Sequence, residues 1–198
     1  GSLVITAYEG HRTRLYRHRI EDNAPTHVAE APADAFHGTE LEDRLLHLAG
    51  LASGRSTLWQ RQRGADAAQD TGLGALVAYR ASSRWLAWQP LDTEQLRVAP
   101  WPSLQPVRTL AFRAGAAGEA FALHDDRLAY VDDGSVWIVR LPDGEPERLP
   151  LQRLPTGLGP NLAIGPDDAV AVTQLVSLDV DLMIADGAVP AQASDRAR

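Results

Sequence analysis

The chain repeats an alternating pattern of apolar and polar residues at multiples of about 40 residues. Three copies begin at Leu15, Leu96 and Val136, so they start 81 and 40 residues apart, and each runs through a polar turn to a proline. A matching run precedes each copy and lies at residues 5–8, 84–88 and 126–130. Because alternation with a period of two is typical of β-strands, each copy predicts a pair of consecutive strands.

Two shorter motifs recur at a second common offset. The sequence Thr-Gly-Leu-Gly at residues 71–74 returns at 156–159, and Asp-Ala-Phe at 34–36 returns as Glu-Ala-Phe at 119–121, in both cases 85 residues later. Short matches arise easily in sequence rich in Ala and Leu, but two unrelated motifs with one offset favour a genuine repeat. Strand-only repeats of this length are typical of the blades of a β-propeller.

The sequence therefore predicts an all-β fold built from propeller blades of four antiparallel strands. The first of five blade equivalents lacks its innermost strand and the last lacks its outermost one, so we expect the C-terminal part of a larger propeller. A tight hairpin is expected at 132–135 (Asp-Asp-Gly-Ser), because glycine adopts a positive φ without strain. Partial helical spacing of leucines within 39–49 is compatible with a short helical turn. The expected blades cover residues 3–31, 32–70, 71–115, 116–155 and 156–190, and a polar tail follows at 191–198.

Composition excludes several kinds of chemistry. The 198 residues are 44% hydrophobic, so a sizeable core is available. All 19 basic residues are Arg, which excludes a lysine nucleophile, and the absence of Cys excludes thiol catalysis, disulfides and zinc-thiolate sites. The basic residues are scattered and outnumbered by 26 acidic ones, a pattern that argues against a nucleic-acid surface. No apolar run has membrane-spanning length, and no signal peptide is recognised.

No group of residues predicts a catalytic or metal site. The six histidines lack the spacing of a metal motif, and adjacent carboxylates are typical of turns. Asp179 and Asp181 share one face of an expected strand and could bind a cation, although a solvated edge strand is the preferred interpretation. We therefore expect no catalytic residue, no metal and no cofactor. The adjacent carboxylates are Asp125 with Asp126, Asp132 with Asp133, and Asp167 with Asp168.

Propellers bind ligands or partners over a central channel that is lined by their innermost strands. We place His37, Arg80, Ala122 and Asn161 on those strands, and the polar side chains His37, Arg80 and Asn161 are the candidate binding residues. Ordinary contacts that hold the blades together are the alternative interpretation. The aromatic residues at equivalent third-strand positions are expected to pack between blades instead of stacking on bases or sugars; they are Tyr16, Trp59 and Trp137.

Three segments carry a resemblance to two kinds of known protein. Residues 143–149 (DGEPERL) and the turn at 165–168 (GPDD) resemble the blade exits and turns of TolB-like, WD40-like propellers. Residues 177–186 (SLDVDLMIAD) resemble the closing strand of the C-terminal sensor propeller of CadC-like, membrane-anchored winged-helix transcriptional regulators. The second resemblance implies a sensor located in the periplasm or otherwise outside the cytoplasm, and a cytoplasmic location stays open.

We expect a non-enzymatic sensor or protein-interaction propeller, the regulatory part of a bacterial signalling or transcription-regulatory protein. Its expected partner is another protein or the N-terminal part of the same propeller, and a small ligand is also compatible. No direct contact with nucleic acid and no membrane segment are expected in this chain. Two alternatives remain, an accessory propeller of a peptidase-type enzyme and a catalytic hydrolase or lyase propeller. The latter requires converging His, Asp or Glu residues, or a bound cation, at the channel.

Overall fold

The computed structural model describes residues 2–9, 12–19, 21–31, 34–50, 53–113, 120–151, 161–165 and 169–173. These residues contain sixteen β-strands and no α-helix, which confirms the all-β prediction. None of them forms a helix long and apolar enough to cross a membrane. The strands are β1 (Ser2–Glu9), β2 (Arg12–Arg19), β3 (Thr26–Ala31), β4 (Phe36–Leu41), β5 (Arg44–Ala49), β6 (Thr57–Gln62), β7 (Gln69–Ala81), β8 (Trp85–Pro90), β9 (Gln95–Pro100), β10 (Arg108–Ala111), β11 (Phe121–His124), β12 (Arg127–Asp132), β13 (Ser135–Arg140), β14 (Glu147–Arg148), β15 (Asn161–Ile164) and β16 (Val170–Thr173).

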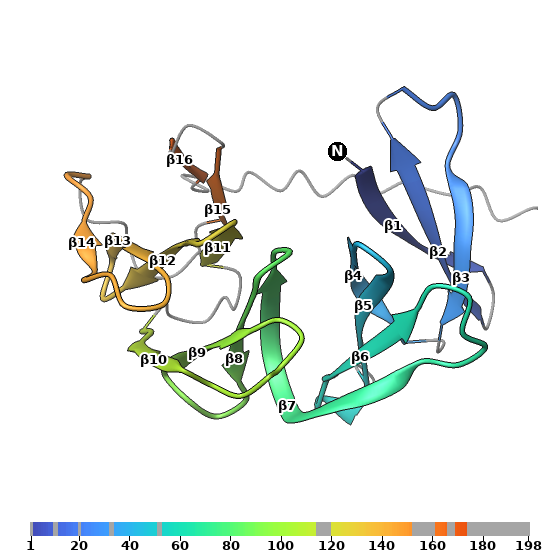
Figure 1. Cartoon of the computed structure of the whole chain (residues 1–198), viewed down its shortest axis with the longest axis horizontal. Helices are drawn as coiled ribbons and strands as arrows, with labels where there is room; N and C mark the ends of the chain where they lie inside the picture. Colours follow the sequence, from blue (N-terminus) through green and yellow to red (C-terminus); the bar gives the residue numbers. More distant parts are fainter. Residues whose placement is uncertain are drawn as a thin grey trace, which may run out of the picture.

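The strands form antiparallel sheets that follow one another around an arc (Figure 1). Strands β1–β3 form the first sheet, β4–β10 a continuous run of seven, β11–β14 a sheet of four, and β15–β16 a pair. The inner side of the arc carries β4, the end of β7, β11 and β15. Within each sheet, consecutive strands pair with each other, as expected for propeller blades.

Strand β7 carries the chain from one blade to the next. Its first residues pair with β6, and its second half, from Leu76 to Ala81, pairs with β8. Between the two halves, Gly72 and Gly74 have φ angles of 75° and 79°, which glycine adopts without a steric cost. The first copy of the repeated Thr-Gly-Leu-Gly motif therefore lies at a blade connection. The second copy, at 156–159, lies outside the described residues.

The repeat predicted the strand pairs correctly. Its three copies are β2, β9 and β13, and each pairs antiparallel with the preceding strand, β1, β8 or β12. The expected hairpin joins β12 to β13 through Asp133 and Gly134, which have φ angles of 48° and 71°. The blade boundaries stay predictions.

The suggested helical turn at residues 39–49 is wrong. This segment forms β4 and β5, which are joined by a turn at Glu42 and Asp43. Strand β5 is buried on both faces, because neighbouring sheets pack against each of them, and Leu45–Ala49 are consecutive buried residues. A strand that is buried on both faces loses the polar–apolar alternation, so its leucines imitate helical spacing.

Among the described residues, the core has three apolar clusters that lie between neighbouring blades. The largest joins β7–β10 to β11–β13 and β15, and Trp137, one of the three aromatic residues expected between blades, packs against it. The second joins β4–β6 to β7–β9. The third joins the first sheet to the second blade, and its buried members among the described residues are Leu15, Ala29 and Leu45. It is the smallest of the three clusters that these residues form.

The first sheet approaches β4 closely at Gly38. A Cβ atom on Gly38 would lie 2.5 Å from Cγ1 of Val4 on β1, a distance that real Cβ atoms do not adopt. Val4 has a stiff β-branched side chain, so it cannot move aside easily. The absence of a side chain at Gly38 therefore lets the inner strand of the second blade pack against β1.

We predict that Gly38→Ala destabilises the chain by about 1–3 kcal/mol, because the new methyl group overpacks this contact. Urea denaturation measures the loss. Val4→Ala removes the obstructing methyl groups, so the double variant should lose less stability than the sum of the two single variants. Additive losses would show that Gly38 is not required by the contact with Val4.

His47 departs from the repeat. It pairs with Trp59 across β5 and β6, and the same position in the first, third and fourth blades is occupied by Ile5, Trp88 and Tyr130. The His47 side chain is buried, with 2% exposed, and neither ring nitrogen has a hydrogen-bond partner among the described residues. Burial and, next, the nearby charge of Arg61 lower the pKa of His47 to about 4. An imidazole thus occupies a position that the repeat uses for apolar side chains.

We predict that His47 makes the chain less stable in mild acid. Its folded pKa lies below its unfolded value of about 6.5, so stability is complete above the unfolded pKa and is lost as the pH falls towards 4. As the pH falls from about 7 to about 5, the titration of His47 lowers the free energy of unfolding by about 2 kcal/mol. Urea denaturation at both pH values should show that the His47→Ile variant loses correspondingly less stability between them than the wild type. An unchanged pH dependence would contradict the assignment.

Candidate functional site

The four residues that the sequence placed near the channel lie on four strands at the inner side of the arc. His37 is on β4, Arg80 on β7, Ala122 on β11 and Asn161 on β15. Strand β11 lies beside both β7 and β15, so β7, β11 and β15 form a continuous row. Ala122 is buried. The binding role of His37, Arg80 and Asn161 stays a prediction.

The structure brings His37 and Arg80 together around one hollow. This hollow has a volume of about 420 Å³ and is lined by His37, Gly38, Thr39, Tyr79 and Arg80. Asn161 does not line it and lies two strands further along the row. The predicted trio therefore divides into a pair that shares a surface and a third residue apart from it.

Tyr79 fixes the wall of this hollow. Its hydroxyl lies 2.5 Å from the carbonyl oxygen of His37, 3.2 Å from that of Leu46 and 3.1 Å from Oγ1 of Thr39. Burial raises the pKa of Tyr79, so the neutral hydroxyl keeps its proton and donates it. His37 has a φ of 52° at a register shift in β4, and the bond from Tyr79 holds this irregular backbone in place.

Arg80 presents a positive charge at the same hollow. Its Nη1 atom donates a hydrogen bond of 2.8 Å to the carbonyl oxygen of Tyr79. The guanidinium carbon lies 5.3 Å from the ring centroid of Phe121 on β11, which is within the range of a cation–π interaction. Arg80 is thus anchored on two strands, and the hollow can receive an acidic or hydrogen-bond-accepting group.

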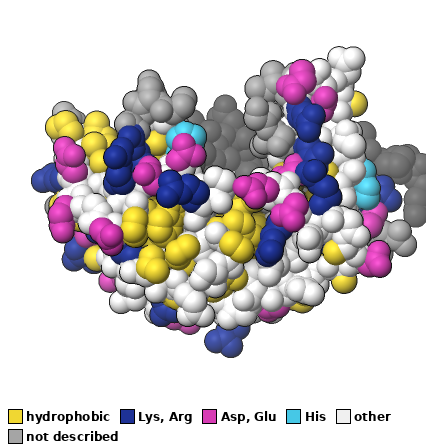
Figure 2. All heavy atoms as spheres, in the orientation of Figure 1, with side chains coloured by type: hydrophobic (Ala, Val, Ile, Leu, Met, Phe, Trp, Pro, Cys, Tyr) yellow, Lys and Arg dark blue, Asp and Glu magenta, His cyan; other side chains and the backbone are white. Residues whose placement is uncertain are grey.

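The molecular face in Figure 2 combines apolar and charged side chains. Apolar side chains gather in the middle of the view, and Asp, Glu and Arg side chains surround them. Non-obligate protein interfaces have this mixed character, with an apolar centre and a polar rim. The face is therefore chemically compatible with contact to another protein.

The carboxylates that the sequence singled out serve the fold where the structure describes them. Asp132 accepts hydrogen bonds of 2.9 Å from both Nε and Nη2 of Arg113, and these bonds hold its pKa below the usual value. Asp125 and Asp133 have positive φ angles in turns. Within the described ranges, no three His, Asp or Glu residues are grouped so as to hold a metal ion. The pairs at 167–168 and 179 and 181, and the segment 177–186, lie outside these ranges.

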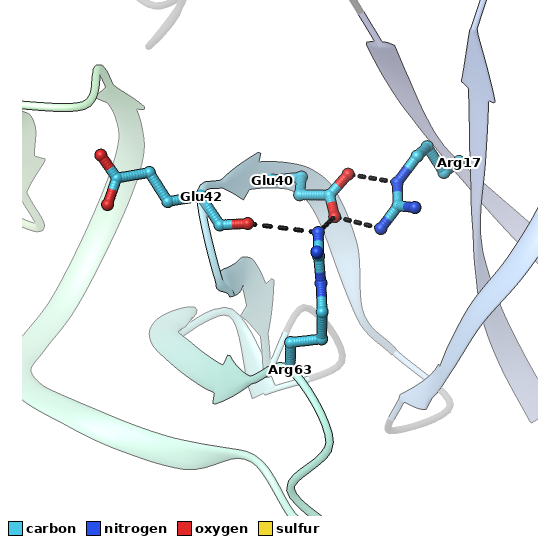
Figure 3. A network of polar contacts seen from close by, with 4 residues as sticks. All are labelled: Arg17, Glu40, Glu42 and Arg63. Atoms are coloured by element: carbon cyan, nitrogen blue, oxygen red, sulfur yellow. Dashed lines mark hydrogen bonds and ion pairs between the residues drawn. The ribbon is translucent and has the colours of Figure 1, made fainter.

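Sequence reasoning missed an ion network between the first two sheets (Figure 3). Arg17 on β2 donates through Nε and Nη2 to both carboxylate oxygens of Glu40 on β4. Arg63, which follows β6, donates to the same carboxylate at 2.9 Å and to the carbonyl oxygen of Glu42 at 3.2 Å. Burial opposes ionisation of Glu40, but these hydrogen bonds hold its pKa below the usual value.

One signal in the sequence could have indicated half of this network. Arg17 is two residues from Leu15, so both side chains point to the same face of β2. A charged side chain on an apolar strand face predicts a partner of opposite charge, because an unpaired buried charge is costly. The partner Glu40 lies 23 residues away on another sheet. No local pattern connects the two residues.

No family model and no curated protein matches the chain. Among solved structures, it is similar to TolB from Acinetobacter baumannii, with a TM-score of 0.60 and 10% identity over 88% of this chain and 46% of TolB. It is also similar to a chain of a nidogen/laminin complex, with a TM-score of 0.59 and 13% identity over 87% of this chain and 70% of that one. Similarity to a prolyl endopeptidase has a TM-score of 0.51 and 11% identity, over 86% of this chain and 30% of the enzyme.

The comparisons show that the chain has a β-propeller fold like that of TolB. The chain spans less than half the length of TolB. Identities this low establish the fold alone, and one fold serves many functions. The TolB-like part of the sequence resemblance is confirmed, whereas the CadC-like part stays a prediction.

We predict that Tyr79→Phe destabilises the chain by about 1–2 kcal/mol, because it leaves the carbonyl groups of His37 and Leu46 without this donor. Tyr8→Phe is the matched control. The Tyr8 hydroxyl also donates to a carbonyl, that of Ala35 at 3.2 Å, but 59% of Tyr8 is exposed, so water can replace the bond. Thermal unfolding should separate the two variants, and equal losses would contradict the role assigned to Tyr79.

Proposed function

We propose that this chain is a non-enzymatic propeller segment that binds a protein partner at the inner side of its arc. The observation that carries the proposal is the hollow beside His37 and Arg80. Tyr79 holds the backbone of His37 at the wall of the hollow, and Phe121 holds the guanidinium of Arg80. Both groups are therefore fixed before a partner binds. A pre-organised site loses less entropy on binding than a mobile one.

The partner that this hollow suits is a protein with an acidic or carbonyl-rich segment. Arg80 supplies donors to carboxylate or carbonyl oxygens, and His37 is exposed beside it. The mixed apolar and charged face around the arc adds contact area of the kind found in transient complexes.

The wider role that we propose is the sensory or regulatory part of a bacterial signalling or transcription-regulatory protein that acts outside the cytoplasm. Support comes from the resemblance of residues 177–186 to CadC-like regulators and from the TolB-like fold. A second candidate is an accessory propeller of a peptidase-type enzyme. Structural similarity to a prolyl endopeptidase favours it, although the chain covers only 30% of that enzyme.

The test is site-selective cross-linking in bacteria that express the chain. We predict that His37→Ala/Arg80→Ala loses a cross-linked protein that the wild type captures, and that the purified partner then binds the variant at least about tenfold more weakly. Arg148→Ala, an exposed arginine on the outer strand β14, is the matched control and should retain the partner.

Two outcomes would overturn the proposal. A purified partner that binds the wild type and the double variant equally would place the interface elsewhere. A peptidase domain recovered as the constant cross-linked neighbour would favour the accessory-propeller candidate instead. Thermal unfolding of each variant shows whether a loss of binding reflects the hollow or the fold.

A further inference from the structure

Strand β1 has an open hydrogen-bonding edge among the described residues. It pairs with β2 along one edge over its eight residues, and no described strand pairs with its other edge. The corresponding strands of the next three blades, β5, β8 and β12, pair with a strand on each side. In each of those blades the inner partner is a single antiparallel strand, which is β4, the second half of β7 or β11.

The exposure of β1 agrees with this open edge. Val4 points toward the second blade, where it lies against Gly38, yet it is only half-buried. The residues at its position in the next three blades, Leu46, Ala87 and Ala129, are completely buried. Since Val4 has a neighbouring blade on the side to which it points, the cover that it lacks is that of an inner strand.

Strand β1 also has none of the features that usually protect the edge of a sheet. Its register with β2 runs without a shift, and residues 2–8 (SLVITAY) contain no proline and no charged side chain. Exposed edges are usually short, charged, bulged or interrupted by proline. The outer edge strands of the later sheets are short, since β10 has four residues and β14 has two. The long apolar edge of β1 is therefore suited to pairing with a further strand.

The fourth blade shows which backbone groups face an inner strand. There the amide of Val131 donates at 3.0 Å to the carbonyl oxygen of Ala120, directly before β11. Val131 follows Tyr130 as Thr6 follows Ile5, and Ile5 and Tyr130 occupy the same position in their blades. The amide of Thr6 therefore faces the open edge of β1.

The remaining backbone groups of β1 follow from the alternation of a strand. Hydrogen-bonding groups of successive residues point to opposite edges, so the amides of Val4, Thr6 and Tyr8 face the open edge. The amides of Ile5 and Ala7 face β2. Main-chain groups in such a row give affinity to an added strand, and the side chains beside them give specificity.

The inner strands of the later blades indicate which side chain the added strand needs. At the position opposite Trp88 the third blade has Tyr79, and at the position opposite Tyr130 the fourth blade has Phe121. Both aromatic residues are buried. Ile5 occupies the same position in β1, and an aromatic residue opposite a β-branched one is a favourable cross-strand pair.

We propose that β1 binds an extended segment of a partner protein, which adds as an antiparallel inner strand and places an aromatic residue opposite Ile5. A second copy of the chain fits less well, because its β1 brings β2 and β3 into a position that holds one strand in the other blades. The proposal uses the backbone of β1 and not the hollow beside His37 and Arg80. Failure of one proposal leaves the other intact.

The first experiment is amide hydrogen exchange of the whole chain, followed by NMR with and without a peptide. The peptide has the sequence of residues 118–124 (GEAFALH), which includes β11. In the free chain we expect the amides of Val4, Thr6 and Tyr8 to exchange at least about tenfold faster than those of Ile5 and Ala7. A saturating amount of peptide should slow the first three amides at least about tenfold and leave the other two unchanged.

Fluorescence anisotropy of the fluorescein-labelled peptide then measures the affinity of two variants. Thr6→Pro removes the amide at the open edge but no hydrogen bond to β2, so it should weaken binding at least about tenfold. Thr6→Ala is the matched control, because it keeps the backbone amide, and it should bind within about twofold of the wild type. Proline in place of the second alanine of the peptide removes the amide opposite Val4 and should also weaken binding at least about tenfold.

Four results contradict the proposal. Slow exchange of the Thr6 amide in the free chain at every concentration would show that the chain's own residues cover the edge. Slow exchange that appears only at high concentration, together with a dimer in light scattering, would assign the edge to a second copy. Peptide binding that leaves the three amides unprotected would place the peptide elsewhere. If Thr6→Pro is unstable in thermal unfolding, the two peptides supply the comparison, and equal binding of both excludes strand pairing.

Discussion

Face-to-face packing of neighbouring sheets is the interaction on which this structure depends. The central strands β5, β8 and β12 have runs of consecutive buried residues, so each sheet is covered on both faces. Burial of this kind removes a large apolar area from water, which is the main favourable term in folding. The sheets that contain these strands therefore rely on a neighbour on each side, and a polar group buried at such an interface is costly when it has no hydrogen-bond partner.

The interfaces meet this requirement in different ways. Between the later sheets, aromatic and aliphatic side chains such as Trp85, Phe112 and Phe121 form a continuous core. Between the first two sheets the apolar cluster is small, and the Glu40 network supplies the contact instead. Removal of one partner from such a network leaves a partly buried charge unpaired, whereas an apolar contact weakens gradually. The first interface is thus more specific in its geometry and more sensitive to single changes.

The repeat predicted strand identity and pairing because that information is local. Alternation, turn residues and a fixed spacing place β1–β2, β8–β9 and β12–β13 without any knowledge of distant contacts. The helical suggestion failed at β5 because burial on both faces hides the period of two. The contacts of Arg17 with Glu40 and of Tyr79 with His37 were not predictable, since they join strands that do not pair with each other and lie 23 and 42 residues apart. The sequence could place His37 and Arg80 near each other only on the assumption that the innermost strands of the blades line one channel.

Comparison of the blades with one another is more informative than any single motif. Where the other copies have Ile5, Trp88 and Tyr130, the second blade has His47. At the same interface Gly38 permits a close approach to Val4, and Glu40 binds two arginines. Packing alone would favour an apolar side chain at His47 and a matched number of charges around Glu40. Departures from the repeat therefore gather at one interface, where they make the core less stable than packing alone would. Such an interface is the first place to look for binding.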